Sequence, residues 1–497
     1  MRNTIDRAGS AAARAAARVA VPGGVYVDGA WRTPHDAPEL VVHDPGTGEE
    51  VARLAAGGAA DARAAIAAAA RAFPRWSALS AEERGAPLRR AHALVLQRAD
   101  ELSRALTLEQ GKPLAEARGE VLWGAEFLLW YAEEIRRPHG ELIPGNGPGQ
   151  RLVVRRRPRG VVACVTPWNF PSSMILRKVA PAVAAGNTVV LKPAEQTPLS
   201  AALLFEVFDA AGFPPGVVNL VCARDPEPIG EAFCAAPEVR QISFTGSLAV
   251  GRRLMRGAAD QVKKVSLELG GSAPFVVFAD ADLDPAVDKL VACKFQNAGQ
   301  SCIAANRVLV ERRIAAEVAD RVVARARALR VGHGLDAGVH VGPLIDRAAV
   351  EKVGRHIADA TERGATLVCG GPPAEGLDPW RYVVPAVLTE VPGGALVERE
   401  ETFGPVVPIT AFGDEQEAVR SANATSYGLA AYVFTRDLGR AVRVGEALEY
   451  GMVGVNDGAL GWVQAPFGGV KASGDGREGG RQGLEEYQDL QYLSVNF

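Results

Sequence analysis

Short apolar runs alternate with longer segments of helical spacing through the middle of the chain, and this alternation limits its fold more than any other feature. The predicted strands are residues 160–166, 188–192, 217–221, 241–244 and 264–268, and the predicted helices between them are 174–185, 201–211, 229–235 and 248–258. Strands and helices that alternate at this spacing form a parallel sheet with helices on both faces. Doubly wound sheets bind ligands at the carboxyl ends of their strands, so polar residues there are the first candidates for a site.

A second alternation follows and predicts a second α/β domain. Its segments are residues 275–278, 284–297, 305–310, 313–329, 348–363, 384–389 and 415–422. Nearer the N-terminus, residues 22–50 predict a small hairpin region, and residues 59–138 predict helices, one of which begins after a cap at Ser80. Residues 487–496 predict a terminal strand. Because an exposed strand edge needs covering, we expect this strand to pair with another subunit.

The composition limits the classes of protein to which the chain can belong. Its 497 residues predict roughly two to four domains. A hydrophobic fraction of 48% with 23% charged residues excludes a mostly disordered chain. The formal net charge of −3 gives no electrostatic reason to expect a nucleic-acid partner. No stretch approaches the ~20 apolar residues of a membrane-spanning helix.

The first 20 residues are rich in alanine and arginine and loosely resemble an organelle transit peptide. Asp6 and the scarcity of serine argue against a transit peptide, so we interpret residues 1–21 as a flexible tail and expect a cytoplasmic protein. The six cysteines and seven histidines are scattered and include no CxxC pair. The sequence therefore predicts neither a metal site nor a disulfide framework.

Residues 474–479 match the dinucleotide-binding pattern GxGxxG, but their context does not fit it. The pattern needs a strand before it and a helix with a second strand after it. Here a glycine-rich loop precedes the match, and the roughly twenty residues that follow are fewer than the ~30 of a βαβ unit. We therefore reject this match as a cofactor site.

Three segments carry residue types suited to catalysis. Cys302 follows a small polar turn in FQNAGQSCIAANR, where backbone amides favour a stabilised thiolate; the alternative is a cysteine that only packs. Glu268 ends an apolar strand in SLELGGS, where burial would raise its pKa toward that of a general base; the alternative is a salt-bridged or solvated side chain. Asn169 follows a predicted strand in TPWNFP, where its amide can stabilise an oxyanion or only shape a turn.

These segments belong to a set of six motifs that occur in the order TPWNFP, LKPAEQTP, FTGS, LELGG, GQSC and EETFGP. Together they resemble the NAD(P)-dependent aldehyde dehydrogenase superfamily over residues 22–497. The resemblance implies an α/β fold of two doubly wound parallel-sheet domains with a small β element for bridging and oligomerisation. The implied parts are a cofactor domain at 22–143 and 161–268, a catalytic domain at 269–480, and the β element at 144–160 and 481–497. It also implies a homodimer or homotetramer.

The resemblance implies a role for each catalytic residue. Cys302 would attack the aldehyde carbon, and Asn169 with the Cys302 backbone N–H would hold the resulting oxyanion. After hydride transfer to the nicotinamide, Glu268 would activate the water that releases the acid from the thioester. Lys178 and Glu478 match positions that the family uses for support and proton relay. Covalent capture is chemically sensible because it turns an aldehyde into an alkoxide, which is a better hydride donor.

The same motifs imply the cofactor residues. Lys192 and Glu195 would hold the adenosine ribose, and because a Glu195 carboxylate would repel a 2′-phosphate, we expect NAD rather than NADP. Gly246 and Ser247 open a helix whose N-terminus can face the pyrophosphate. The other residues expected at the cofactor are Thr166, Pro167, Trp168, Leu269, Glu401 and Phe403.

Within the superfamily, the runs PWNFPSSMILRK, APFGGVKASG and GREGG are most similar to the succinate-semialdehyde dehydrogenase group. Arg177 matches an arginine with which that group grips the substrate carboxylate; the alternative is a surface arginine beside an acid. The sequence departs from the group at three positions. Gln296 stands in place of an arginine, Gly461 in place of a serine, and Ala304 in place of a second cysteine that acts as a redox switch.

We therefore expect a small-molecule aldehyde as substrate, with succinate semialdehyde first. Phe170 is expected to line the substrate site, and Trp462 could shape a pocket for a neutral or bulkier aldehyde, so a broad or differently specialised aldehyde dehydrogenase remains the alternative. A CoA-acylating relative is disfavoured because its chemistry needs no water-activating base such as Glu268. The presence of Cys302, Glu268 and Asn169 together disfavours a binding protein without turnover.

Overall fold

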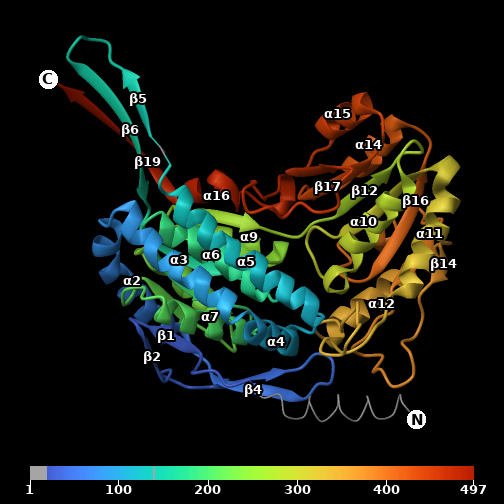
Figure 1. Ribbon diagram of the computed structural model, residues 1–497, viewed down its shortest axis with the longest axis horizontal. Coiled ribbons are helices and arrows are strands. Elements are labelled where there is room, and N and C mark those ends of the chain that lie inside the picture. The colour runs from blue at the N-terminus through green and yellow to red at the C-terminus, as the bar shows by residue number, and fades with distance from the viewer. Residues whose placement is uncertain (1–18, 138–139) are drawn as a thin grey trace.

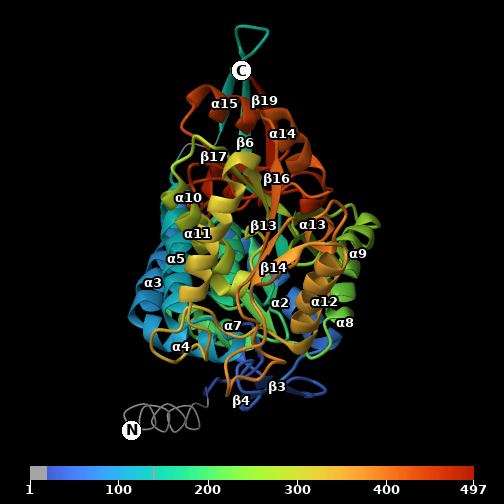
Figure 2. The same cartoon turned by 90° about the vertical axis from the view of Figure 1, so that its right-hand side faces the viewer.

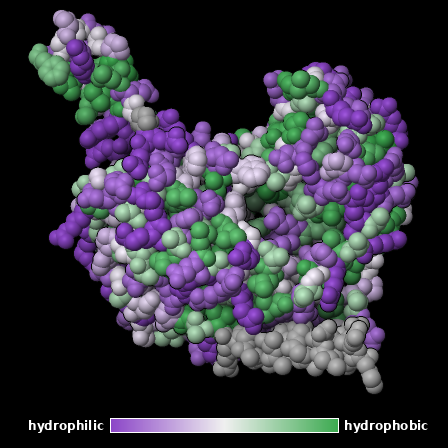
Figure 3. Space-filling model, in the orientation of Figure 1, coloured by the Kyte–Doolittle hydropathy of each residue, from purple (hydrophilic) through white to green (hydrophobic). Residues whose placement is uncertain are grey.

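The computed structural model describes residues 19–137 and 140–497. Two seven-stranded sheets with their helices form the two halves of the body, and a three-stranded sheet projects from one half as an arm (Figure 1). The α/β fold with two doubly wound sheets and a small additional β element is therefore confirmed. The surface is hollowed where the two halves meet (Figure 3).

The first sheet contains the five strands predicted between residues 160 and 268, each within two residues of its predicted ends. In order across the sheet, its strands are β11 (Lys264–Glu268), β10 (Val239–Thr245), β7 (Val161–Val165), β8 (Thr188–Lys192), β9 (Val218–Val221), β1 (Val25–Val27) and β2 (Ala30–Trp31). Neighbours from β11 to β9 are parallel, and β1 and β2 add an antiparallel edge. The strand order reverses between β7 and β10, and a crevice for ligands forms at such a reversal.

Helices cover both faces of this sheet, with α3 and α5 on one side and α8 and α9 on the other (Figure 2). They are α2 (Ala59–Ser77), α3 (Ala81–Gln97), α4 (Ala99–Gln110), α5 (Leu114–Glu134), α6 (Pro171–Ala184), α7 (Pro198–Ala210), α8 (Glu227–Ala235) and α9 (Leu248–Ala259). The predicted cap at Ser80 is present, since its hydroxyl accepts the Glu83 N–H while the Glu83 carboxylate accepts the Ser80 N–H. α6 is buried along its whole length.

The second sheet lies in the other half of the body. Its strands, in order, are β14 (Thr366–Cys369), β15 (Ala386–Thr389), β16 (Val406–Phe412), β13 (Ala305–Glu311), β12 (Ala273–Val277), β17 (Ala430–Phe434) and β18 (Met452–Val455). The helices of this part of the chain are α10 (Leu283–Phe295), α11 (Ala315–Ala328), α12 (Arg347–Glu362), α13 (Leu396–Arg399), α14 (Glu415–Asn423), α15 (Leu438–Ala447) and α16 (Gly480–Glu485). All neighbouring strands are parallel except β14, which runs antiparallel to β15. The sequence did not single out β14, β16, β17 or β18.

The arm consists of β5 (Glu141–Pro144), β6 (Gln150–Pro158) and β19 (Gln488–Asn496), all antiparallel. The predicted terminal strand is present, and along its whole length one edge pairs with β6 of its own chain. Pairing of this strand with another subunit stays a prediction. Hydrophobic surface is visible on the arm in Figure 3. The large side chains exposed there include Leu142, Leu490, Tyr492 and Phe497.

The N-terminal region differs from its prediction in two ways. Of residues 22–50, only β3 (Glu39–His43) and the start of β4 (Glu50–Ala55) form a separate hairpin, because β1 and β2 join the first sheet. Residues 1–18 of the predicted flexible tail lie outside the described residues. Residues 19–21 were also predicted to belong to that tail, but Val19 donates its N–H to the Val51 carbonyl at 3.0 Å and so joins the fold. No described helix is long and apolar enough to cross a membrane.

Candidate active site

The predicted cofactor residues of the first sheet lie at one edge, at the carboxyl ends of its parallel strands. Thr166 follows β7 and donates its N–H to the carbonyl of Lys192, the last residue of β8, at 3.2 Å. Gly246 follows β10 and donates its N–H to the carbonyl of Glu268, the last residue of β11, at 3.0 Å. The other predicted cofactor residues on these loops are Pro167, Trp168, Glu195, Ser247 and Leu269. They flank the point where the strand order reverses.

A strained turn presents Cys302 to this edge. The predicted helix 284–297 ends at Phe295, and Asn297, Ala298 and Gly299 have φ values of 50°, 55° and 76°. Successive residues in the left-handed region are uncommon and persist where surrounding contacts impose them. Gly271 lets this loop approach β11 closely, because a Cβ there would collide with the Cys302 carbonyl oxygen. The LELGG and GQSC motifs therefore meet in space.

Burial shapes the chemistry of the Cys302 thiol. The residue is partly accessible, but the surrounding protein raises the pKa of Cys302 to about 12, and the charges of Glu401 and Glu268 add to this while Arg177 opposes it. The prediction of a stabilised thiolate is therefore wrong for this structure. Removal from water penalises the charged form more than the turn amides favour it. Cys302 needs to lose a proton before it can act as a nucleophile.

Glu268 is a buried carboxyl group with no local partner. It is 3% exposed, and neither carboxylate oxygen has a hydrogen-bond partner within the described part of the chain. Burial raises the pKa of Glu268 well above its usual value, and the charge of Glu478 adds to this, while Arg177 and Lys178 oppose it. The predicted rise in pKa is confirmed, and the alternative of a salt-bridged or solvated glutamate is wrong. A carboxyl group in this state is suited to accept and return a proton during turnover.

Asn169 is held through both its side chain and its backbone. Its Nδ2 donates to the Gln300 carbonyl at 3.0 Å, and its own carbonyl accepts from Lys112 Nζ at 2.8 Å and Asn297 Nδ2 at 2.9 Å. These bonds use one of the two Nδ2 protons, and the other can stabilise a negatively charged oxygen. The contacts also tie the loop after β7 to the loop that carries Cys302.

Glu478 binds two basic residues that are neighbours on α6. Arg177 Nη2 lies 2.7 Å from Glu478 Oε2, Lys178 Nζ lies 2.6 Å from Oε1, and none of the three side chains is more than 3% exposed. Burial alone would raise the pKa of Glu478, but Lys178 and Arg177 together hold it below its usual value. Arg177 is therefore not on the surface, as the alternative interpretation required, although it does lie beside an acid, Glu478, as that interpretation also stated. Charge interactions link this buried group to Glu268.

Aromatic rings surround the guanidinium of Arg177. Its central carbon lies 4.1 Å from the ring centre of Phe467, 5.6 Å from that of Trp123 and 5.7 Å from that of Phe127. The predicted substrate residue Gly461 borders this group, because its carbonyl accepts a hydrogen bond from Trp123 Nε1 at 2.6 Å. The structure therefore brings Arg177 and Gly461 into one region.

The other predicted substrate residues lie elsewhere around the site. The ring of Phe170 packs under Lys112 Nζ, with 3.9 Å between the nitrogen and the ring centre. Gln296 is exposed at the end of α10, and Trp462 is 56% exposed beside Gly461. Among the contacts of the described residues, none joins Phe170 or Gln296 directly to Arg177.

The strand ends carry polar groups and rings that remain available to a ligand. The hydroxyls of Thr166 and Thr245 are buried without a hydrogen-bond partner within the described residues. The rings of Trp168 and Phe403 meet edge to face, with centroids 5.5 Å apart. Lys192 and Glu195 form an ion pair, and Ser247 caps α9 by accepting the Val250 N–H.

Glu401 completes this set of groups. Its Oε1 accepts the Gly271 N–H at 2.9 Å, and burial raises the pKa of Glu401 to about 7. Hydroxyls, carboxylates, rings and a helix N-terminus along one sheet edge fit a dinucleotide, whose riboses and phosphates bind such groups. Within the described residues, no group of three His, Cys, Asp or Glu side chains is placed to hold a metal ion.

A comparison with known families identifies this arrangement. The model of the aldehyde dehydrogenase family matches residues 31–493. The chain belongs to this family. It is an NAD(P)-dependent oxidoreductase acting on aldehydes, as the motifs predicted.

Several relatives of this aldehyde dehydrogenase are enzymes named after aldehydes that resemble one another. Glutarate-semialdehyde dehydrogenase of Pseudomonas aeruginosa is 49% identical over 471 residues, covering 95% of this chain and 97% of the relative. Succinate-semialdehyde dehydrogenase [NADP(+)] GabD of Escherichia coli is 49% identical over 469 residues, covering 94% and 97%. 3-Sulfolactaldehyde dehydrogenase of Pseudomonas putida is 50% identical over 470 residues, covering 95% and 96%. The solved structure of succinate-semialdehyde dehydrogenase from Burkholderia pseudomallei matches with a TM-score of 0.94 at 48% identity, covering 96% and 98%.

Sequence analysis missed a second charged pair beside this aldehyde dehydrogenase site. Lys112 Nζ and Glu120 Oε2 lie 2.5 Å apart, and both side chains are 1% exposed. Lys112 contacts Asn169, while Glu120 accepts the backbone N–H groups of Ser172 and Ser173 at 2.9 and 3.1 Å. A signal for the pair was available, because Glu120 falls on the apolar face of a predicted helix. A charged residue at such a position implies a buried partner.

The rejected GxGxxG match has a structural explanation in this aldehyde dehydrogenase. Its loop packs on β11, where Leu267 donates its N–H to the Asp475 carbonyl at 3.0 Å. A Cβ at Gly474 would collide with the Leu267 carbonyl, so the glycine permits close approach of two backbones. The loop leads to Glu478 and so helps to place that residue against α6.

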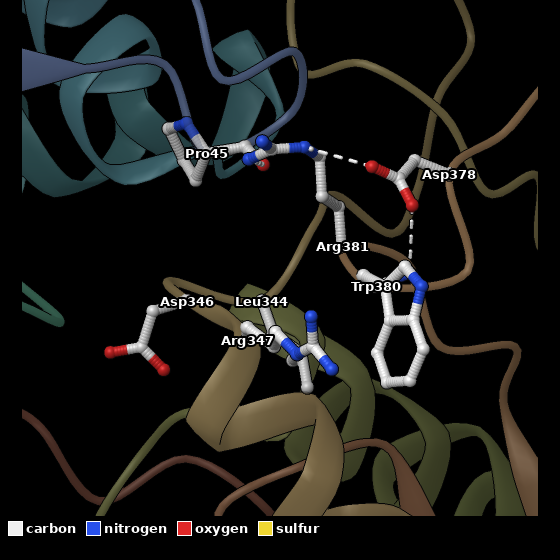
Figure 4. Close-up of a pocket in the computed structure, with 7 residues that line it drawn as sticks. All are labelled: Pro45, Leu344, Asp346, Arg347, Asp378, Trp380 and Arg381. Carbon is white, nitrogen blue, oxygen red and sulfur yellow. Dashed lines mark hydrogen bonds and ion pairs between the residues drawn. The ribbon is translucent and has the colours of Figure 1, made fainter.

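Figure 4 shows a cavity of about 250 Å³ whose lining includes none of the predicted site residues. It is lined by Pro45, Leu344, Asp346, Arg347, Asp378, Trp380 and Arg381. Arg381 Nε pairs with Asp378 at 3.1 Å, and Arg347 pairs with Glu351 at 2.8 Å while its guanidinium lies 3.9 Å from the Trp380 ring centre. Because no predicted site residue lines this cavity, we assign it no part in aldehyde oxidation.

Proposed function

We propose that this aldehyde dehydrogenase oxidises a semialdehyde that carries an acid group, with succinate semialdehyde as the first candidate. The observation that carries the proposal is the buried guanidinium of Arg177, which lies among aromatic rings. Its positive charge acts to lower the pKa of both Cys302 and Glu268, so it lies near both groups. Arginine binds carboxylates through two parallel hydrogen bonds. Its Nε has no hydrogen-bond partner within the described residues, so a donor remains for the substrate.

The names of the three relatives support an anionic substrate. Succinate semialdehyde, glutarate semialdehyde and 3-sulfolactaldehyde each combine an aldehyde with an acid group. Because Arg177 already pairs with Glu478, a substrate carboxylate would share the guanidinium with that residue. Gln296 and Gly461 offer no second cation at this point, so Arg177 is proposed as the main anion contact. A broad or neutral-aldehyde specificity is the alternative.

The proposed reaction begins when the partly accessible Cys302 thiol gives its proton to solvent water and the sulfur adds to the aldehyde carbon. The carbonyl oxygen becomes an oxyanion, which the free Nδ2 proton of Asn169 and the backbone N–H of Cys302 would hold. When bound, the nicotinamide cofactor would accept the hydride that the former aldehyde carbon gives up, and the acyl group would remain on Cys302 as a thioester. Glu268 then takes a proton from water, and the resulting hydroxide attacks the thioester and releases the acid. Lys178 and Glu478 would relay that proton away from Glu268.

The cofactor residues are proposed from the same motifs. Lys192 and Glu195 would hold the adenosine ribose, Gly246 and Ser247 the pyrophosphate, and Glu401 the nicotinamide ribose. The remaining residues proposed to line the cofactor are Thr166, Pro167, Trp168, Leu269 and Phe403. We propose NAD as the preferred cofactor, because the Glu195 carboxylate would repel a 2′-phosphate. The name of the Escherichia coli relative, which specifies NADP(+), counts against this preference, and the ratio of kcat/KM for the two cofactors tests it.

The test of the substrate proposal compares initial rates with succinate semialdehyde and butanal, which have the same number of carbon atoms. A large kcat/KM advantage for succinate semialdehyde supports recognition of the acid group by Arg177. Equal rates, or a preference for butanal, would show that Gln296 and Gly461 leave no working anion site. Glutarate semialdehyde as a third substrate measures how far the acid group can lie from the aldehyde.

We also propose a cytoplasmic homodimer or homotetramer, in which the apolar residues exposed on the arm are covered by another subunit. The domain bounds are proposed as predicted: a cofactor domain at 22–143 and 161–268, a catalytic domain at 269–480, and a bridging element at 144–160 and 481–497. The exposure of Leu490 and Tyr492 supports an interface on the arm, since large apolar groups gathered on a surface mark contact sites.

A further inference from the structure

Two buried charges meet behind the loop that carries Asn169. Lys112 and Glu120 are paired at 2.5 Å and are almost completely removed from water. A buried pair of this kind is weak evidence for stability, because desolvation offsets most of the attraction unless further hydrogen bonds satisfy both groups. Here the further side-chain hydrogen bonds of both residues end on the segment from Asn169 to Ser173.

The lysine holds Asn169 and its neighbour. Lys112 Nζ donates to the Asn169 carbonyl at 2.8 Å and lies 3.9 Å from the centre of the Phe170 ring. The Lys112 backbone N–H donates to Gln110 Oε1 at 3.1 Å, and Gln110 Nε2 donates to Asn297 Oδ1 at 2.9 Å. Asn297 Nδ2 in turn donates to the Asn169 carbonyl at 2.9 Å. The Asn169 carbonyl therefore accepts one hydrogen bond from Lys112 and a second from Asn297, and Asn297 is itself held by Gln110 at the end of α4.

The glutamate fixes the start of α6. Phe170 precedes this helix and supplies no side-chain cap. Glu120 reaches across from α5 and accepts the N–H groups of Ser172 and Ser173, which satisfies two donors of the first turn. This sets the direction in which the chain leaves Asn169. Glu116, on the same helix, accepts the Asn297 N–H at 2.7 Å and so holds the turn before Cys302.

We propose that Lys112 and Glu120 are positioning residues that place the Asn169 amide against the oxyanion formed on Cys302. The inference rests on the proposed role of Asn169 in holding that oxyanion. Neither charged group contacts the thiol, so their effect passes through Asn169. A displacement of about 1 Å at such a donor lowers the rate on the order of a hundredfold.

The test is a single-turnover measurement of hydride transfer, with enzyme in excess over succinate semialdehyde and with saturating cofactor. We expect Lys112→Met to slow this step by about ten- to a hundredfold with cofactor affinity unchanged, and Lys112→Arg to retain part of the rate. The double variant Lys112→Met/Glu120→Gln removes both charges, so it leaves no unpaired buried ion that would prevent folding. It is expected to be as slow as Lys112→Met.

A double-mutant cycle with Asn169→Ala separates positioning from general damage. If Lys112 acts through Asn169, Lys112→Met has little further effect once the amide is gone. Equal slowing with and without the amide would overturn the proposal, as would normal hydride transfer in the double variant. If Asn169→Ala itself transfers hydride at the normal rate, the proposed oxyanion role fails and this inference with it. If Asn169→Ala is slow but Lys112→Met is normal, only this inference fails.

Glu109 provides a matched control. It is also a buried glutamate that caps a helix from a neighbouring one, accepting the N–H groups of Leu199 and Ser200 at 2.6 and 2.9 Å at the start of α7. α7 does not carry Asn169, so Glu109→Gln is expected to leave hydride transfer unchanged. Equal slowing in Glu109→Gln would show that any lost helix cap has this effect, and would overturn the specific role of Glu120.

Discussion

Arg177 and Glu478 form an ion pair of 2.7 Å in the interior, with Lys178 on the other oxygen of the same carboxylate. The arginine proposed to bind the substrate's acid group is thus one of two cations that keep Glu478 charged. Glu478 in turn raises the pKa of Glu268. An acid group bound at Arg177 therefore alters the electrostatic field at the proposed base.

Replacing this arginine is expected to separate anionic from neutral substrates. In Arg177→Gln, kcat/KM for succinate semialdehyde falls about ten- to a hundredfold, the size of a lost charge-assisted hydrogen bond, whereas kcat/KM for butanal falls much less. Glu478 keeps its partner Lys178, so the variant leaves that carboxylate paired. Initial rates with both aldehydes make the comparison. Equal losses would show that Arg177 supports the fold or the proton network rather than the substrate.

The pH dependence of turnover is expected to follow Glu268. Because burial raises the pKa of Glu268, its carboxyl group is protonated at low pH and becomes a base only as the pH rises through that raised value. Steady-state kcat should therefore increase with pH above the usual range of a glutamate. In Glu268→Gln, one equivalent of cofactor is still reduced, but turnover stops and the rise with pH disappears. A variant that keeps both turnover and the rise would refute Glu268 as the base.

Alkylation of Cys302 is expected to be slow at neutral pH in the cofactor-free protein. With the pKa of Cys302 raised to about 12, the thiolate fraction is small and grows roughly tenfold with each pH unit. Iodoacetamide labelling followed by mass spectrometry measures this rate. Cys302→Ala serves as the control for the accessible Cys234 and Cys369. Rapid labelling at neutral pH that the alanine variant lacks would contradict the raised pKa.

A methyl group at Gly271 is expected to reduce activity far more than stability. The new Cβ of Gly271→Ala would collide with the Cys302 carbonyl, and moving the nucleophile by about 1 Å costs on the order of a hundredfold in rate. Gly445→Ala, in α15, is the control, since nothing lies within 4 Å of its Cβ position. It should raise the free energy of unfolding by about 0.5–1 kcal/mol and leave the rate unchanged. Full activity in Gly271→Ala would show that the loop adapts.

Charges placed on the arm are expected to disrupt an oligomer. Leu490→Lys/Tyr492→Lys should elute as a smaller species than the unmodified protein, because a buried contact would have to accept two unpaired charges. Size-exclusion chromatography with light scattering measures the mass. Val262→Lys provides the control, since Val262 is also exposed but lies in the loop after α9. An unchanged mass in the arm variant would place the subunit contact elsewhere.

The pattern of the sequence predicted the local parts of this protein. The five strands around β7 and the cap at Ser80 depend on the periodicity of nearby residues and on hydrogen bonds within one turn, so they can be recognised without distant contacts. The motifs at the strand ends identified the family for the same reason. β1 was assigned to the N-terminal hairpin region because its partner in the first sheet, β9, lies far along the chain.

The tertiary structure decided the pKa shifts, the burial and the hydrogen-bond partners of the side chains that these motifs contain. The sequence alone determined the family, the parallel sheet and the place of Glu268 and Asn169 at or just after the ends of its strands. It did not determine that Cys302 has a raised pKa, that Arg177 is paired with Glu478, or that Lys112 binds both Glu120 and the Asn169 carbonyl. The physical reason is that pKa values and buried ion pairs depend on desolvation and on charges brought together from distant parts of the chain. Periodicity along the sequence reports neither.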